Sequence, residues 1–83
     1  MTIKILGTGC ANCKRLEQLT LNVLAELDIA ADVQKVEDIQ GIMSYGILST
    51  PGLVINEKVI SQGKVPLPAT LKHWIEDVAK SEA

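Results

Sequence analysis

The chain has 83 residues, a net charge of −2, 47% hydrophobic and 22% charged residues, which describes a small globular protein near the lower size limit for a self-sufficient core. It has no Phe, one Trp, one Tyr and no basic cluster, so nucleic-acid binding is not expected. This length allows one domain, over residues 1–83. Since the sequence shows neither a run of transmembrane length nor a recognisable signal peptide, we expect the protein in the cytoplasm.

The N-terminal part of the chain predicts a strand, a long helix and a second strand. Residues 2–6 are β-branched or aliphatic, as in a buried strand. After a bend at Gly7-Thr8-Gly9, residues 11–27 carry apolar positions at helical spacing, namely Leu16, Leu19, Val23, Leu24 and Leu27. Asp28 interrupts this pattern, and the mixed polar and apolar residues 29–36 predict a strand at a sheet edge. These three elements form a βαβ unit, whose crossover is almost always right-handed.

A short helix is predicted next. Asp38 is suited to cap its N-terminus, and Gly46 is suited to end it. Three apolar residues, Ile39, Ile42 and Met43, follow the helical spacing and lie on one face of it. This helix would lead into the loop before the next strand.

The last part of the chain predicts a hairpin and a final helix. Residues 53–55 and 58–61 read as strands, joined by the tight connection Asn56-Glu57. Pro66 and Pro68 then precede a helical segment. One apolar face of that segment carries Leu71, Trp74, Ile75 and Val78.

The only two cysteines, Cys10 and Cys13, lie three positions apart where the first helix begins. A Cys-x-x-Cys between a strand and a helix predicts a redox dithiol. Cys10 falls near the N-cap, where unpaired N–H groups and the helix dipole stabilise a thiolate, and Lys14 adds a positive charge that would tune its acidity. Cys13 is in phase with the apolar stripe. We therefore expect an exposed attacking Cys10 and a shielded resolving Cys13.

The chain resembles the thioredoxin superfamily, and most of all its small thioredoxin-like, redox-active disulfide proteins. The resemblance rests on Gly9-Cys10-Ala11-Asn12-Cys13-Lys14, on Tyr45-Gly46 ahead of Ser49-Thr50-Pro51, and on Gly63 after the last strand. It implies a thioredoxin-like α/β fold, with a four-stranded mixed sheet and three flanking helices in the order βαβαββα. It also implies a cis proline beside the dithiol, which by position would be Pro51.

The resemblance further implies an activity and its partners. The protein would be a protein disulfide oxidoreductase without a bound cofactor. It would act in electron transport between disulfide-containing client proteins and a thiol reductase as electron donor, with no nucleic-acid or membrane partner. An extended client segment would pair with the backbone of Thr50, just before Pro51, while Gly9 and Gly63 leave room on either side.

A soft-metal site for copper or zinc, using the same two sulfurs, remains as a second interpretation. Copper and heavy-metal chaperone domains also place Cys-x-x-Cys between a strand and a helix. They usually carry Met where this chain has Thr8, and they end in a strand, whereas this chain is predicted to end in a helix. A closed zinc site needs four ligands, and the only histidine, His73, lies in the predicted last helix. We therefore expect no metal ligands in this chain.

A purely structural disulfide would close too short a loop to add much stability.

Overall fold

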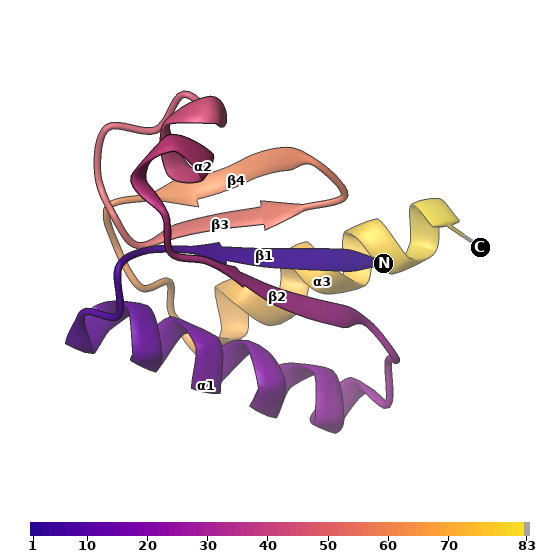
Figure 1. Ribbon diagram of the computed structural model, residues 1–83. Helices are drawn as coiled ribbons and strands as arrows, with labels where there is room; N and C mark the ends of the chain where they lie inside the picture. The colour runs from indigo at the N-terminus through magenta and orange to yellow at the C-terminus, as the bar shows by residue number, and fades with distance from the viewer. Residues whose placement is uncertain (83) are drawn as a thin grey trace.

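A four-stranded sheet lies at the centre of the computed structural model, which describes residues 1–82 (Figure 1). The elements are β1 (Thr2–Leu6), α1 (Ala11–Leu27), β2 (Asp32–Val36), α2 (Ile39–Ser44), β3 (Gly52–Ile55), β4 (Lys58–Gln62) and α3 (Pro68–Glu82). Their order is the predicted βαβαββα. Among the described residues, no helix combines the length and the apolar character needed to span a membrane.

The strands are arranged in the order β2-β1-β3-β4. β1 pairs in parallel with β2 and antiparallel with β3, and β3 pairs antiparallel with β4. The sheet is therefore mixed, as predicted, and β2 lies at its edge. Because β1 is central, its carboxyl end, where the dithiol follows, is fixed by neighbours on both sides.

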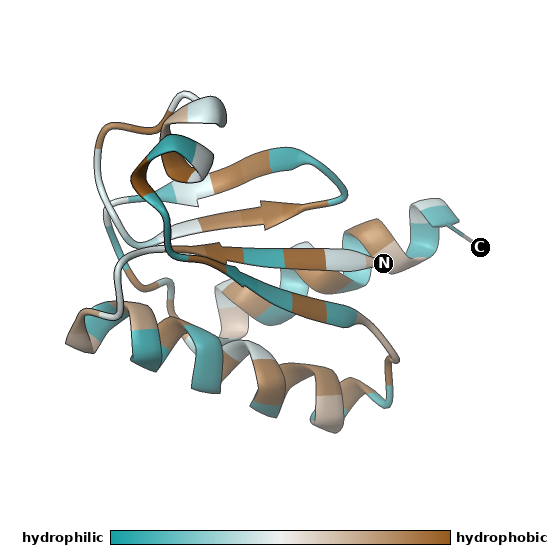
Figure 2. Ribbon diagram, viewed as in Figure 1, coloured by the Kyte–Doolittle hydropathy of each residue, from teal (hydrophilic) through white to brown (hydrophobic). Residues whose placement is uncertain are grey.

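Each face of the sheet has its own hydrophobic cluster. The larger cluster joins the sheet to α1 and α3 through Ile3, Ile5, Leu16, Val23, Leu24, Leu53, Ile55, Leu71 and Ile75. The smaller one joins the opposite face to α2 and the loop after it through Leu6, Ile42, Ile47 and Val54. Figure 2 shows the matching pattern, in which hydrophobic and hydrophilic segments alternate along α1. The two clusters together hold β1 between layers of apolar side chains.

The C-terminal end of α1 explains where β2 begins. Asp28 takes the left-handed conformation, with φ of 55°, and Ile29 N–H still donates to Leu24 O at 3.0 Å. The N–H groups just after the helix thus bond to its last carbonyls and are not free to pair with β1. The strand therefore begins only at Asp32. The predicted start at residue 29 was three residues early. Thr20 was also missed as a core residue, although its hydroxyl donates to Leu16 O at 2.7 Å and it is fully buried.

α2 confirms its predicted cap, and its apolar face is only partly buried. Asp38 accepts a hydrogen bond from Gly41 N–H at 2.7 Å. Ile42 is buried, whereas Ile39 and Met43 are each 66% exposed. A helix of six residues rests on the sheet along a single line through Ile42, and both Ile39 and Met43 are turned from that line to the same side, toward solvent. The face that carries these three apolar residues is therefore buried only at Ile42.

The hairpin and the last helix agree with the prediction. Asn56 and Glu57 both have positive φ, 50° and 68°, as in the two-residue turns that suit the twist of a hairpin. On α3, Leu71 and Ile75 are fully buried, and two further apolar residues pack against the same cluster, Trp74 and Val78. α3 thus closes the face that α1 covers.

Candidate active site

The dithiol lies where β1 ends and α1 begins. Gly7 N–H donates to Val36 O at 3.0 Å, which extends the parallel ladder past the end of β1. Gly9 then takes a φ of 84°, a conformation that glycine adopts without strain, and turns the chain into the helix. Cys10 is the N-cap of α1. Cys10 and Cys13 form a disulfide, with their Cα atoms 5.1 Å apart.

The two sulfurs differ in their surroundings. Cys10 is exposed, and its sulfur accepts a hydrogen bond from Cys13 N–H at 3.2 Å. Cys13 is only 5% exposed and lies in the buried stripe of α1. This asymmetry agrees with the expectation from the helical spacing. A sulfur that faces the first N–H groups of a helix is stabilised as a thiolate. Lys14 follows on the helix with an exposed side chain.

Gly7 is a site residue that the sequence reasoning missed. A Cβ atom at this position would overlap the Cys13 sulfur and would lie 3.1 Å from Cys13 Cβ. The backbone of Gly7 thus forms one wall of the place where Cys13 packs. The sequence analysis placed Gly7 in a flexible bend. Its packing role could have been suspected from its position directly after a buried strand and six residues before a buried cysteine.

The loop that carries Thr50 and Pro51 lies next to this wall. Thr50 Cβ is 3.9 Å from the place that a Cβ on Gly7 would take. The peptide bond between Thr50 and Pro51 is cis, and Pro51 is buried while Thr50 is exposed. The structure therefore brings Thr50, 37 residues after Cys13 in sequence, next to the Gly7 backbone against which Cys13 packs.

The end of β4 holds this loop in place. Gly63 N–H donates to Pro51 O at 2.9 Å, and Leu48 N–H donates to Gln62 Oε1 at 3.0 Å. A Cβ on Gly63 would lie 3.0 Å from Ser49 Cβ, whereas a Cβ on Gly9 would meet nothing within 4 Å. Gly9 thus borders open space, and Gly63 packs closely against the loop.

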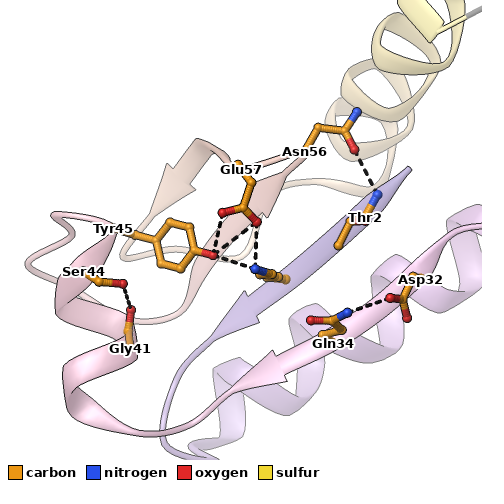
Figure 3. A network of polar contacts seen from close by, with 9 residues as sticks. Thr2, Asp32, Gln34, Gly41, Ser44, Tyr45, Asn56 and Glu57 are labelled. Carbon is orange, nitrogen blue, oxygen red and sulfur yellow. Dashed lines mark hydrogen bonds and ion pairs between the residues drawn. The ribbon is translucent and has the colours of Figure 1, made fainter.

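A polar network ties the segment before this loop to the sheet (Figure 3). Lys4 Nζ lies 2.7 Å from Glu57 Oε1 and donates to Tyr45 Oη at 2.8 Å. Tyr45 Oη in turn donates to Glu57 Oε2 at 3.1 Å. The hydrogen bond with Glu57 raises the pKa of Lys4, and the hydrogen bond from Lys4 lowers the pKa of Glu57. The network joins β1, the end of α2 and the hairpin turn.

The arrangement of possible metal ligands bears on the second interpretation. Within residues 1–82, no group of three or more His, Cys, Asp or Glu side chains is placed to hold a metal ion. His73 lies on the exposed side of α3, where its Nε2 is 3.3 Å from Asp77 Oδ2. Any metal bound by the two sulfurs would therefore need further ligands from solvent or from another molecule.

Comparison with known proteins gives consistent matches. A family model described as a thioredoxin domain matches residues 1–76. A thioredoxin of Methanothermobacter thermautotrophicus is 35% identical over 72 residues, which cover 87% of this chain and 94% of the relative. A thioredoxin of Methanocaldococcus jannaschii is 31% identical over 76 residues, which cover 92% and 87% respectively.

Solved structures agree at the level of the fold. The oxidised thioredoxin of Plasmodium falciparum superposes with a TM-score of 0.61 at 18% identity, covering 94% of this chain and 80% of that one. Thioredoxin 1 of Thermosipho africanus gives a TM-score of 0.58 at 16% identity, with full coverage of both chains.

A disulfide joins an exposed cysteine at the helix N-cap to a buried partner, and the relatives of the chain are thioredoxins. Together with the fold, these findings define a thiol–disulfide oxidoreductase. Such an enzyme moves two electrons by making and breaking the bond between its own sulfurs. The chain belongs to the thioredoxin family.

Proposed function

We propose that this protein exchanges electrons between its dithiol and disulfide-containing client proteins, with Cys10 as the nucleophile and Cys13 as the resolving thiol. The difference in exposure carries the proposal, because Cys10 is exposed at the helix N-terminus while Cys13 is only 5% exposed. Only the exposed sulfur is reachable by a disulfide on another protein. Lys14, one turn further on, adds a positive charge that favours the Cys10 thiolate.

The electron balance of the proposed cycle is simple. The Cys10 thiolate attacks one sulfur of the client disulfide, and the other client sulfur leaves as a thiolate. Cys13 then attacks Cys10, the bond between Cys10 and the client breaks, and the client's second sulfur leaves. The client gains two electrons and the dithiol is oxidised to the observed disulfide. A thiol reductase would return the electrons, so the cycle uses no bound cofactor.

The loop beside the dithiol suits the binding of an extended client segment. Thr50 is exposed next to the buried Pro51, and Gly9 borders open space. Main-chain pairing with Thr50 would hold many client sequences in one geometry. Gly63 fixes the position of this loop through the hydrogen bond from its N–H to Pro51 O. Leu48, 98% exposed, offers an apolar contact at the start of the same loop.

The use of cysteine supports a site of action in the cytoplasm. Both cysteines of the chain belong to the dithiol. In a reducing compartment a close cysteine pair is more often catalytic than a permanent crosslink. We also propose that residues 1–83 work as one domain, because the two hydrophobic clusters draw on elements from both halves of the chain.

Trapping of clients tests the proposed roles. In Cys13→Ser a mixed disulfide on Cys10 has no resolving thiol, so clients should accumulate as covalent adducts that dithiothreitol releases. The matched control Cys10→Ser should capture far fewer. Redox titration of the unmodified protein should show a two-electron couple at about −180 to −300 mV, the range of dithiol oxidoreductases. A cysteine pair that never forms the intramolecular disulfide, or equal capture by both variants, would contradict the proposal.

A further inference from the structure

A small pocket opens beside Cys13, between the first turns of α1 and the end of β2. It has a volume of about 60 Å³, and both Cys13 and Gly7 line it. A Cβ atom on Gly7 would overlap the Cys13 sulfur, so this sulfur packs at the Gly7 wall. The pocket therefore gives access to a sulfur that is otherwise shielded, and it has room for only a few water-sized groups.

Charged side chains form the rim of this pocket. Lys14 and Glu17 come from α1, Lys35 comes from β2, and Glu37 follows β2. Glu17 Oε2 lies 3.5 Å from Lys35 Nζ, so Lys35 offsets the charge of that carboxylate. The two lysines balance the two glutamates at the rim. A small anion is therefore not repelled while both lysines are present.

The two sulfurs of the disulfide differ as leaving groups. In disulfide exchange the attacking atom bonds to one sulfur and the other leaves as a thiolate, and the more stable thiolate leaves faster. Cys10 is the N-cap of α1, and its sulfur accepts the Cys13 N–H at 3.2 Å, which favours the Cys10 thiolate. Burial disfavours a thiolate at Cys13. Attack at Cys13, with Cys10 as the leaving group, is therefore the faster direction for any nucleophile that reaches Cys13.

Access decides which nucleophiles can attack in this direction. Cys13 is only 5% exposed, so a cysteine of another protein reaches only the exposed Cys10. A nucleophile of one or a few heavy atoms fits the pocket. We propose that hydrosulfide enters this pocket, attacks Cys13 and reduces the oxidised protein, as a small-molecule electron donor in addition to the thiol reductase. The inference rests on the proposed stabilisation of the Cys10 thiolate, and it involves no client protein.

The proposed reaction balances in two steps. In the first, the hydrosulfide sulfur bonds to Cys13 Sγ, the disulfide bond breaks, and Cys10 leaves as a thiolate. Cys13 then carries a persulfide. In the second, another hydrosulfide attacks the outer sulfur of the persulfide, Cys13 leaves as a thiolate and takes up a proton, and a disulfanide anion departs. Two hydrosulfide ions are thus oxidised to one disulfanide, and the protein gains two electrons.

The position of attack can be determined with sulfite, a small sulfur nucleophile whose adduct stays on the sulfur where it forms. Oxidised protein is mixed with sulfite in the absence of oxygen, free thiols are blocked with N-ethylmaleimide at successive times, and fragmentation mass spectrometry locates both groups. Glutathione serves as the larger nucleophile. We expect sulfite to place the sulfonate on Cys13 and the maleimide on Cys10. Glutathione should form its mixed disulfide on Cys10.

The rate of reduction by hydrosulfide tests the pocket itself. Lys35→Gln leaves the Glu17 carboxylate without its partner, so the reactions with hydrosulfide and with sulfite should slow by about fivefold, the effect of one unit charge a few ångströms away in water. The matched control is Lys72→Gln, since Lys72 pairs with another glutamate of α1, Glu26, at 3.1 Å. That variant should match the unmodified protein. The reaction of glutathione at Cys10 should be unchanged in both.

Three results would overturn this inference. Sulfonate on Cys10, or glutathione on Cys13, would show that the pocket does not select nucleophiles by size. An unmodified protein that hydrosulfide does not reduce would remove the proposed donor. Equal slowing in Lys72→Gln would show that the effect does not depend on the pocket. The proposed function fails on a different result, the absence of trapped clients in Cys13→Ser, so the two failures are distinguishable.

Discussion

The two cysteines of the dithiol occupy different environments only three residues apart. Cys10 is exposed at the N-cap, and Cys13 is 5% exposed. In the reduced protein we therefore expect iodoacetamide to label Cys10 well before Cys13, as followed by mass spectrometry of quenched samples. In urea the two rates should converge. Labelling of Cys13 first in the folded protein would contradict the assigned roles.

Gly7 sets how closely Cys13 approaches the sheet. Because an added Cβ would overlap the Cys13 sulfur, Gly7→Ala should destabilise the oxidised protein by about 1–3 kcal/mol, as overpacked cores do. Gly9→Ala is the control, since its Cβ would meet nothing within 4 Å and only its positive φ would cost about 1–2 kcal/mol. Urea unfolding gives both values. A Gly7→Ala protein as stable as the original would show that this packing does not matter.

At the scale of one element, α2 separates buried from exposed apolar residues. Ile42 is 7% exposed and Met43, its neighbour, is 66% exposed. Ile42→Ala should cost about 2–5 kcal/mol through the cavity it leaves. Met43→Ala should change the free energy of unfolding by less than about 0.5 kcal/mol. Denaturant titration of the two variants checks this directly, and comparable losses would mean that α2 packs differently.

The network of Lys4, Tyr45 and Glu57 joins three elements and predicts a dependence on pH. The hydrogen bond from Lys4 holds the pKa of Glu57 below its ordinary value of 4.5. A lowered carboxyl pKa stabilises the fold above that ordinary value, and the contribution is lost as the pH falls through the lowered one. The raised pKa of Lys4 contributes below the ordinary lysine range and is lost only in strong alkali.

Glu57→Gln therefore should reduce stability by a constant amount near neutral pH, and the deficit should shrink as the pH falls below 4.5. Thermal unfolding across this range measures it. The matched control is the same substitution in a Lys4→Met background, where the acid-dependent part should shrink to what the hydrogen bond from Tyr45 contributes. A deficit that persists unchanged into acid would show that the carboxylate charge plays no part.

Across the whole molecule, local patterns predicted most of the fold. The strand at residues 2–6, the helix at 11–27 and the buried face of the last helix follow from periodicity, because each of these segments is long or strongly patterned. The exposure of Ile39 and Met43 did not follow, since helical spacing does not reveal how few residues of a short helix reach the sheet. The start of β2 depended on the hydrogen bonds of residues after Asp28, which also are not visible in sequence.

The candidate site also contains features that local sequence patterns predict and features that they do not. The pairing of Cys10 and Cys13 and their different exposure were predictable, because both depend on spacing along one helix. The wall formed by Gly7 and the pocket lined by Glu17 and Lys35 were not, because they need β1, β2 and α1 in place together. Contacts between distant segments have no local signal in a single sequence.

The hydrophobic clusters on the two faces of the sheet are built from apolar side chains. We therefore expect chelators of copper and zinc to leave the melting temperature unchanged, because apolar burial dominates folding. Differential scanning calorimetry with and without chelator, together with the metal content of the purified protein, provides the check. Unfolding by a chelator, or one tightly held metal per chain, would favour the soft-metal interpretation.

The strand order leaves β2 and β4 as the two edges of the sheet. Unpaired edges invite further strands to add, which is the usual start of aggregation. Here one edge carries the exposed Asp32 and Lys35, and the other begins with the exposed Lys58 and pairs with β3 across a register shift. Charges and irregular register both discourage growth at an edge. These edge features disfavour strand pairing between copies of an enzyme that is proposed to hold extended segments of other proteins.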